Sequence, residues 1–303
     1  MFCLPVGVKL MKRPNFFILG APKCGTTSFA SWLSAHPEIF MSSPKEPRYF
    51  NRDFQSFFRP RSIKEYEQLF EAADEGHLVV GEATTGYLHS LEAVPAILQY
   101  NADAKFLVCL RNPVHMVPSL YSQNLKSGIE KELSLERAWA LQKERRRGVL
   151  VPRTCPDPKQ LLYGPICSLG EQMERLFKLV SRERVLVILL DDMKIDPRRE
   201  YRRALDFLGV GDDGRSHFPV ENARQIPRYP RLAQGVRVAA TVRKRLGIGK
   251  GTGVASIVQS WNNRRAINNL ISPEMQEKLC IYFRDDVEKL SKLLGRDLTS
   301  WLA

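Results

Sequence analysis

The feature that most constrains this chain is a short strand followed by a glycine-rich turn and a helix near the N-terminus. Residues 16–19 form an apolar run with aromatic side chains, which predicts a buried strand. Gly20, Pro22 and Gly25 interrupt this run, and the hydroxyl residues 26–28 then predict the capped start of a helix. The first turn of a helix presents N–H groups and the positive end of the helix dipole. This stretch therefore predicts a cradle for phosphate or a similar anion.

The loop differs from the P-loop of ordinary nucleotide hydrolases and kinases. Gly20 and Gly25 have the spacing of Gly-x-x-x-x-Gly-Lys-Ser/Thr, but Thr26 occupies the lysine position. The lysine lies inside the loop instead, at Lys23. The Lys-Ser/Thr pair that serves a triphosphate and magnesium is therefore missing. The loop suits an anion whose reactive group is not a γ-phosphate.

The same loop resembles the 5′-phosphosulfate loop of sulfotransferases that use 3′-phosphoadenosine 5′-phosphosulfate (PAPS). In that family the loop reads Pro-Lys-Ser/Thr/Cys-Gly-Thr-Thr-Ser. The resemblance implies PAPS as the donor and 3′-phosphoadenosine 5′-phosphate (PAP) as the product, with no metal required. It implies that Lys23 neutralises the charge on the leaving oxygen. The residues that it assigns to donor binding are Pro22, Lys23, Cys24, Gly25, Thr26, Thr27 and Ser28.

A second anion site is predicted where a later strand ends. Residues 105–110 form the clearest buried strand, Arg111 follows directly, and Ser119 lies in the helix beyond. A guanidinium and a hydroxyl placed in this way can hold a phosphate between them. The family's 3′-phosphate motif, Arg-Asn/Asp-Pro-x-x-Arg-x-x-Ser-x-Tyr, resembles this stretch, with Met116 where a second arginine is common. Two such motifs in this order indicate one nucleotide with phosphates at both ends of its ribose.

Two carboxylates are candidate catalytic bases. Prolines flank Lys45 and Glu46, so this charged pair should lie in an extended, stiff loop. Taken alone, the pair is typical of an exposed salt pair. It resembles the motif Lys-Glu-x-x-x-Phe of carbohydrate sulfotransferases, whose glutamate is the proposed general base. Glu82 is the second candidate. Its surroundings resemble the Glu-Lys-Ser/Thr-Pro-x-Tyr motif of the heparan-sulfate branch, but Ala83 replaces the lysine and weakens the case for a heparan-like acceptor.

Four further segments have less specific patterns. Residues 51–61 interleave basic and aromatic side chains, which either hold a sugar or acidic acceptor or pack against the next helix. The charge run 144–147, with the proline-rich stretch after it, is more typical of a solvated face than of a lid. Lys250 and Gly251 lie in a late glycine-rich turn that touches the cofactor in some relatives, although a plain turn between helices is favoured. The acidic pair 191–192 is interpreted as structural, because the family chemistry needs no metal.

The order of the elements predicts the fold class. Strands alternate with helices, which indicates an α/β fold with a central parallel β-sheet flanked by helices. The resemblance makes this the P-loop-like sulfotransferase fold. We expect a single domain over residues 1–303, with a short lead at 1–14 and a mainly helical part at 231–303. Ligands should bind at the carboxyl ends of the strands.

Charge and hydropathy limit the partners. Lys and Arg number 46 against 33 Asp and Glu, and the resulting charge of +13 favours anionic ligands, nucleic acid or a membrane surface. No DNA- or RNA-binding motif is present, so nucleic acid is the weaker option. Residues 1–10 are too short to span a membrane, and no signal peptide or anchor is expected. The simplest interpretation is a cytoplasmic protein, whose oligomeric state the sequence leaves open.

The sequence therefore predicts sulfuryl transfer from PAPS to a hydroxyl or amine by in-line displacement. A carbohydrate or glycolipid acceptor is expected because Lys45 and Glu46 resemble the carbohydrate branch, with lipid-linked glycans, small phenols and alcohols still open. One alternative is a P-loop nucleotide kinase that depends on magnesium and ATP. The other is a non-catalytic protein that binds nucleotide or polyanion, for which Ala83 and Met116 leave room.

Overall fold

The computed structural model describes residues 12–56, 59–221, 225–227, 263–265 and 271–303. Contacts group the described residues into two compact units. The first unit runs up to Arg111 and includes Gln172–Pro219. The second contains Asn112–Glu171 and the described residues from Val220 onward. The single-domain organisation stays a prediction.

The first unit is built on a parallel sheet of five strands. Their spatial order is β2 (Ile39–Met41), β3 (Val79–Ala83), β1 (Phe16–Gly20), β4 (Lys105–Leu110) and β5 (Val185–Leu189). All neighbouring strands pair in parallel. The chain places β2 and β3 on one side of β1, and β4 and β5 on the other. Ligands of open parallel sheets bind at the carboxyl ends of the strands where the strand order reverses, which is where β1 ends.

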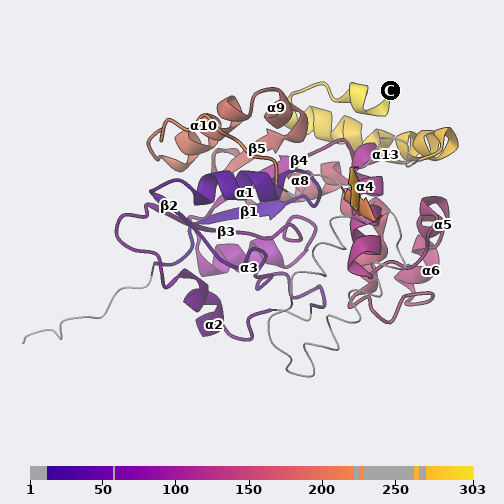
Figure 1. Cartoon of the computed structure of the whole chain (residues 1–303), viewed down its shortest axis with the longest axis horizontal. Coiled ribbons are helices and arrows are strands. Elements are labelled where there is room, and N and C mark those ends of the chain that lie inside the picture. The colour runs from indigo at the N-terminus through magenta and orange to yellow at the C-terminus, as the bar shows by residue number, and fades with distance from the viewer. Residues whose placement is uncertain (1–11, 57–58, 222–224, 228–262, 266–270) are drawn as a thin grey trace, which may run out of the picture. The chain divides into compact units, whose positions relative to one another are not determined.

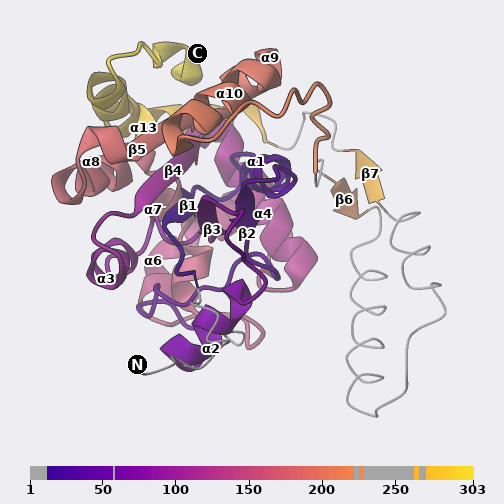
Figure 2. The ribbon, with the colours of Figure 1, turned by 90° about the vertical axis from the view of Figure 1, so that its left-hand side faces the viewer.

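Helices cover both faces of this sheet. Figures 1 and 2 show α1 (Thr26–Ser34) and α3 (Ala93–Tyr100) on opposite faces. All five residues of β1 are buried, as is typical of a strand covered on both sides. The other elements of this unit are α2 (Ile63–Glu67), η1 (Gln68–Phe70), η3 (Arg182–Arg184), α9 (Leu190–Ile195) and α10 (Pro197–Leu208).

Four of the five strands in this sheet were predicted from apolar runs of the sequence. The strands expected at 16–19 and 105–110 are confirmed as β1 and β4. The apolar runs 78–81 and 185–190 predict strands in the same way, and they correspond to β3 and β5. The sequence did not predict β2, because a strand of only three residues gives no recognisable alternation. The expected α/β fold class is confirmed.

The second unit is mainly helical in its described part. Its largest helices, α4 (Pro113–Ser127) and α13 (Pro273–Leu294), pack against each other. The remaining elements are α5 (Leu135–Ala140), α6 (Gln142–Arg146), η2 (Pro158–Leu161), α7 (Tyr163–Cys167), η4 (Thr299–Leu302), β6 (Gln225–Pro227) and β7 (Asn263–Arg265). Strands β6 and β7 pair in antiparallel fashion and were not predicted. Among the described helices, none is long and apolar enough to cross a bilayer.

The helical spacing of apolar side chains over residues 163–180 predicts one helix, and the structure has two. The first is α7, and the second is α8 (Leu169–Leu179), which has residues in both units. Ser168 separates them, and its hydroxyl donates to the carbonyl oxygen of Gly164 at 3.0 Å. A serine hydroxyl that binds the backbone competes with the regular helix in this way.

A buried ion pair shows that a solvated face was the wrong prediction for part of the charge run. Arg145 is 1% exposed, and its two terminal nitrogens donate to the two oxygens of Glu130 at 2.6 and 2.7 Å. The hydroxyl of Tyr163 also donates to Glu130, at 2.9 Å. Arg146 and Arg147 are exposed, as expected. The partner could not be foreseen because the pair forms only when the chain folds.

Candidate functional site

The candidate site is built around the loop that joins β1 to α1. Gly20, Lys23 and Gly25 have φ angles of 141°, 67° and 87°, so the loop turns through conformations that favour glycine. A Cβ on Gly20 would lie 2.6 Å from the carbonyl oxygen of Thr85, which leaves no room for a side chain. Gly25 is the N-cap of α1, so the hydroxyls of residues 26–28 do not cap the helix as expected. The helix therefore begins with its first-turn N–H groups and positive dipole end at the loop.

The loop side chains divide into buried and partly exposed groups. The buried ones are Cys24, Thr26 and Ser28. The partly exposed residues are Pro22, Lys23, Gly25 and Thr27. Burial raises the pKa of Cys24 to about 12, although the positive charges of Arg111 and Lys23 oppose the rise. Because the Cys24 thiol stays protonated near neutral pH, it serves as a structural part of the loop and not as a nucleophile.

Arg111 lies directly after β4 and contacts this loop. Its Nη1 donates to the carbonyl oxygen of Lys23 at 3.2 Å, which braces the residue that has a left-handed backbone. Asn112 follows, and its side chain caps α4 by accepting from the Val114 backbone N–H at 2.8 Å. Ser119 lies on α4 in the second unit and is 3% exposed. The strand end and the helix expected for these two predicted phosphate ligands are both present.

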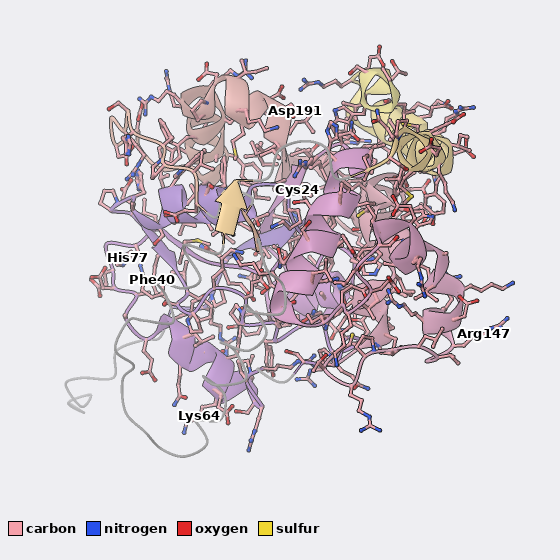
Figure 3. The ribbon with its side chains drawn as sticks, turned by 45° about the vertical axis from the view of Figure 1, so that its right-hand side comes forward. Cys24, Phe40, Lys64, His77, Arg147 and Asp191 are labelled. Carbon is pink, nitrogen blue, oxygen red and sulfur yellow. The ribbon has the colours of Figure 1, made fainter. Side chains whose placement is uncertain are left out.

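Helix α9 packs against the start of α1. A Cβ on Gly25 would lie 2.7 Å from Cε of Met193 and 2.9 Å from Cδ1 of Leu190. Asp191, on the same helix, acts through its charge on the Cys24 thiol, and Figure 3 labels both residues. Both atoms are the ends of flexible side chains that can shift, so the positive φ is the stronger reason for glycine at position 25.

Glu46 lies in the loop after β2 and accepts hydrogen bonds from three side chains. Arg48 donates from Nε and Nη2 to Oε2, at 3.2 and 2.5 Å. Lys45 and Thr85 donate to Oε1, at 3.3 and 3.0 Å. Burial acts to raise the pKa of Glu46, but the charges of Lys45 and Arg48 outweigh it and the pKa is lower than usual. With 24% of its side chain exposed, Glu46 is an ionised carboxylate within reach of solvent.

The backbone of this loop is non-helical, as expected, but it is not simply extended. Glu46 and Arg48 have φ angles of 64° and 57°, in the left-handed region that non-glycine residues rarely adopt. Such conformations cost about 1–3 kcal/mol each and persist where the surroundings hold them. One such contact is the Glu46 backbone N–H, which donates to the carbonyl oxygen of Ala83 at 3.0 Å.

Glu82, on β3, is fully buried and lies among hydroxyl groups. Tyr66 and Tyr87 donate to Oε1 at 2.9 and 2.8 Å, and Thr84 donates to Oε2 at 2.7 Å. Burial raises the pKa of Glu82 to about 7, and the three hydrogen bonds oppose the rise. Glu82 therefore titrates near neutral pH but has no exposed surface in this structure.

Three cations gather near the carboxyl ends of β1 and β4. Arg111 and Lys23 act through their charges on the Cys24 thiol, and Lys45 acts in the same way on Cys109 in β4. Of these cations, Lys45 is paired with Glu46, whereas Lys23 and Arg111 lie at the loop itself, where their charges suit an anionic donor.

Comparison with known proteins assigns the family. A family model described as the sulfotransferase domain matches residues 13–293. The chain belongs to this sulfotransferase family. A crystal structure of a sulfotransferase from Alicyclobacillus acidocaldarius superposes with a TM-score of 0.72 at 27% identity, covering 96% of this chain and 100% of that one. The expected sulfotransferase fold is confirmed.

Curated relatives of this sulfotransferase-family protein match shorter stretches. The membrane-associated sulfotransferase kil1 of Dictyostelium discoideum is 35% identical over 121 residues, which cover 39% of this chain and 25% of the relative. Carbohydrate sulfotransferase 15 of Rattus norvegicus is 30% identical over 154 residues, or 37% and 28% of the two chains. Heparan sulfate glucosamine 3-O-sulfotransferase 3A1 of Mus musculus is 25% identical over 197 residues, or 65% and 46%. The chain thus spans 25% to 46% of the length of these relatives.

Some of the remaining candidate residues of this family member lie in the described part of the chain, and others do not. Lys250 and Gly251 lie outside the described residues, so their contact with the donor stays a prediction. Asp191 and Asp192 lie in the first turn of α9, where Asp191 accepts from Nζ of Lys194 at 3.1 Å. No group of three or more His, Cys, Asp or Glu side chains that could hold a metal occurs in the described part of the chain.

The arginines of the segment 51–61 contact their own loop. Arg52 lies over the ring of Tyr49 with its guanidinium carbon 5.1 Å from the ring centroid, and donates to the hydroxyl at 3.1 Å. Arg59 donates to the carbonyl oxygen of Phe54. These contacts lie within the loop and its flank, so the choice between packing against the next helix and holding an acceptor stays a prediction.

The sequence interpretation missed two partners of the candidate base. Arg48 was present in the motif region without a role, and its position two residues after Glu46 was the only signal available. Thr85 gave no signal, because only the folded sheet brings the ends of β2 and β3 together.

Proposed function

We propose that this protein transfers the sulfuryl group of PAPS to a hydroxyl or amine of a carbohydrate or glycolipid acceptor. The observation that carries the proposal is the loop between β1 and α1. It combines a helix N-terminus, a lysine inside the loop and a bracing arginine from the next strand. The names of two curated relatives, a carbohydrate sulfotransferase and a heparan sulfate sulfotransferase, support the choice of acceptor class.

In this proposal the backbone and hydroxyls of residues 22–28 bind the 5′-phosphosulfate. Lys23 stabilises the negative charge that develops on the bridging oxygen as PAP leaves. Arg111 and Ser119 bind the 3′-phosphate, the arginine as a forked donor. Positioning and electrostatic stabilisation supply most of the catalysis, as they do in phosphoryl transfer.

Glu46 accepts the proton of the attacking group. It is ionised and partly exposed, and Lys45 and Arg48 hold its carboxylate in place. The same cations reduce its basicity, so acceptor binding has to loosen part of the ion pairing before the proton is transferred. Glu82 remains the second candidate base. Its pKa near 7 suits a general base, but its carboxylate is fully buried, out of reach of an acceptor.

Calorimetric titration with PAP, with magnesium and ATP, and with 5′-AMP tests the donor site. We expect tight binding of PAP, weak binding of 5′-AMP, and loss of PAP binding in Arg111→Ala. Arg147→Ala is the matched control, because it removes the same charge from an exposed position in α6's terminal turn. Preference for magnesium and ATP would replace the proposal with a nucleotide kinase.

A transfer assay separates the enzyme from the non-catalytic alternative. Sulfur-labelled PAPS is incubated with p-nitrophenol, galactosylceramide, and desulfated heparan and chondroitin. PAP binding without labelled product from any of these acceptors would favour a nucleotide- or polyanion-binding protein. The proposal needs no metal, so a chelator should leave transfer unchanged. Cytoplasmic location and contact with a lipid-linked acceptor stay predictions.

A further inference from the structure

Two hydroxyl groups connect Glu82 to the loop after β2. The Thr84 hydroxyl donates to Oε2 of Glu82 at 2.7 Å and accepts from the Arg48 backbone N–H at 3.3 Å. The Tyr87 hydroxyl donates to Oε1 at 2.8 Å and accepts from the Phe50 backbone N–H at 3.3 Å. Each hydroxyl therefore stands between the buried carboxylate and the backbone of the same loop.

The ionisation state of Glu82 sets the direction of these hydrogen bonds. A hydroxyl has one hydrogen to donate, and an ionised carboxylate can only accept. Both hydroxyls must therefore point their hydrogens at Glu82 and their lone pairs at the loop. A protonated Glu82 would add a donor to a group already surrounded by donors, so one hydroxyl would have to rotate. The titratable groups that act on Glu82 are Tyr66 on α2, Tyr87 after β3 and, through its charge, Glu46.

The loop needs anchors of this kind because its backbone is strained. Glu46 and Arg48 both have positive φ, and such conformations persist only where surrounding contacts impose them. Aromatic packing supplies part of the anchoring, since the rings of Tyr49 and Tyr66 stack with centroids 4.8 Å apart. Ring packing fixes side chains, whereas the two hydroxyl bonds fix the backbone N–H groups on either side of Tyr49.

We infer that Glu82 is a positioning residue, whose carboxylate orients the Thr84 and Tyr87 hydroxyls so that they hold the Glu46 loop in its catalytic conformation. Glu82 itself contacts neither acceptor nor donor, and proton removal belongs to Glu46. The inference rests on the proposed function only where it assigns proton removal to Glu46. The hydrogen bonds to the loop can be tested without turnover.

Two tyrosines provide a matched pair for the test. Tyr66 and Tyr87 are both fully buried and both donate to the same oxygen of Glu82. Of the two hydroxyls, that of Tyr87 accepts a backbone N–H of the loop, that of Phe50. Tyr66→Phe and Tyr87→Phe therefore remove the same group from the same carboxylate, and differ in the contact with the loop.

The first measurement is amide hydrogen exchange of the full chain, followed in peptides that contain Arg48 and Phe50. At one pH above neutrality, we expect Tyr87→Phe and Glu82→Gln to accelerate exchange in these peptides by about five- to tenfold, the loss of one or two hydrogen bonds. Tyr66→Phe should change exchange less. Equal effects of the two tyrosine variants, or unchanged exchange in Glu82→Gln, would overturn the inference.

The second measurement is turnover of labelled PAPS with whichever probe acceptor is sulfated, together with PAP affinity as a test of intact folding. Tyr87→Phe and Glu82→Gln should lower kcat by about tenfold with PAP affinity unchanged, because only the position of the base is lost. Thr84→Ser should retain more activity than Thr84→Val, since serine restores the hydroxyl.

The pH profile distinguishes positioning from direct proton transfer. Wild-type kcat should rise as pH passes through about 7, where Glu82 ionises, and this rise should be absent from Glu82→Gln. If Glu82 were the base, Glu82→Gln would lower kcat by about a thousandfold or more, while the kcat of Tyr87→Phe would stay near that of the wild type. That result would overturn the inference. If no acceptor were sulfated, the proposed function would fail, and hydrogen exchange would still decide the inference.

Discussion

Glu46 lies in the loop after β2, Glu82 lies on the neighbouring strand β3, and the two carboxylates have opposite electrostatic environments. Glu46 accepts four hydrogen bonds, three of them from cationic side chains, and its pKa is lowered. Glu82 accepts three hydrogen bonds from neutral hydroxyls, and its pKa is raised to about 7. Burial opposes ionisation in both, so the difference comes from the charge of the partners. Hydroxyls fix the geometry of a buried carboxylate, whereas cations also keep it ionised.

The largest effect on kcat should come from substitution of Lys23, which lies outside this pair of carboxylates. The effects of substituting Glu46 and Glu82 can be compared with it. Lys23→Ala should lower kcat by about a thousandfold, because charge on the leaving oxygen is no longer neutralised, with a much smaller loss of PAP affinity. Steady-state kinetics with labelled PAPS and calorimetry with PAP measure the two effects. Lys64→Ala, at an exposed position on α2, is the control. Equal losses in kcat and PAP affinity would contradict a role in the transition state.

Glu46→Gln tests the comparison directly. It keeps the shape of the side chain and removes the proton acceptor, so kcat should fall by about a hundredfold, the lower end of what general-base catalysis contributes. Glu82→Gln should have the smaller effect on kcat in the same assay. If the order of the two variants were reversed, the assignment of the base to the exposed carboxylate would be wrong.

The raised pKa of Glu82 predicts how stability changes with pH. A carboxyl with a higher pKa in the folded state binds more protons than in the unfolded state, so stability falls as pH rises from about 4.5 to about 7. Across this pH range the raised pKa of Glu82 lowers the free energy of unfolding by about 3 kcal/mol. Thermal unfolding at pH 5 and pH 8 should show Glu82→Gln gaining stability relative to wild type at the higher pH. A constant difference between the two proteins would show that Glu82 has an ordinary pKa.

Arg48→Ala should have the smallest effect on kcat, and it tests whether the cations around Glu46 keep this carboxylate ionised. The Arg48 charge lowers the pKa of Glu46, so its removal should move the acidic limb that Glu46 sets to higher pH. This is measured in the Glu82→Gln background, where the rise near pH 7 that belongs to Glu82 is absent. At neutral pH we expect only a few-fold change in kcat, since a stronger base is also less well oriented. An unchanged acidic limb would mean that Lys45 alone keeps Glu46 ionised.

Local patterns were enough to predict the sheet and the loop. Residues 16–19 and 105–110 are apolar throughout, and a strand buried on both faces has this composition. Gly20 and Gly25 stand where the backbone has positive φ, and Arg111 directly follows a strand, so the anion site could be placed along the chain.

Pairs that form only in the folded chain could not be predicted. The bond from Thr85 to Glu46 depends on the order of strands in the sheet, and the bidentate pair between Arg145 and Glu130 depends on tertiary packing. Neither pairing leaves a periodic trace in the sequence. The start of α1 at a glycine was also missed, because three hydroxyl residues in a row favour a side-chain cap.

The contact between α9 and the glycine-rich loop has a consequence for the newly made protein. Gly25 packs against Leu190 and Met193, which are added to the growing chain much later. At ribosomal rates of about 5–20 residues per second, the roughly 160 residues in between take roughly 8–30 s to synthesise. The loop therefore leaves the ribosome well before the helix that completes its packing, and the nucleotide cradle is finished only when α9 has been made.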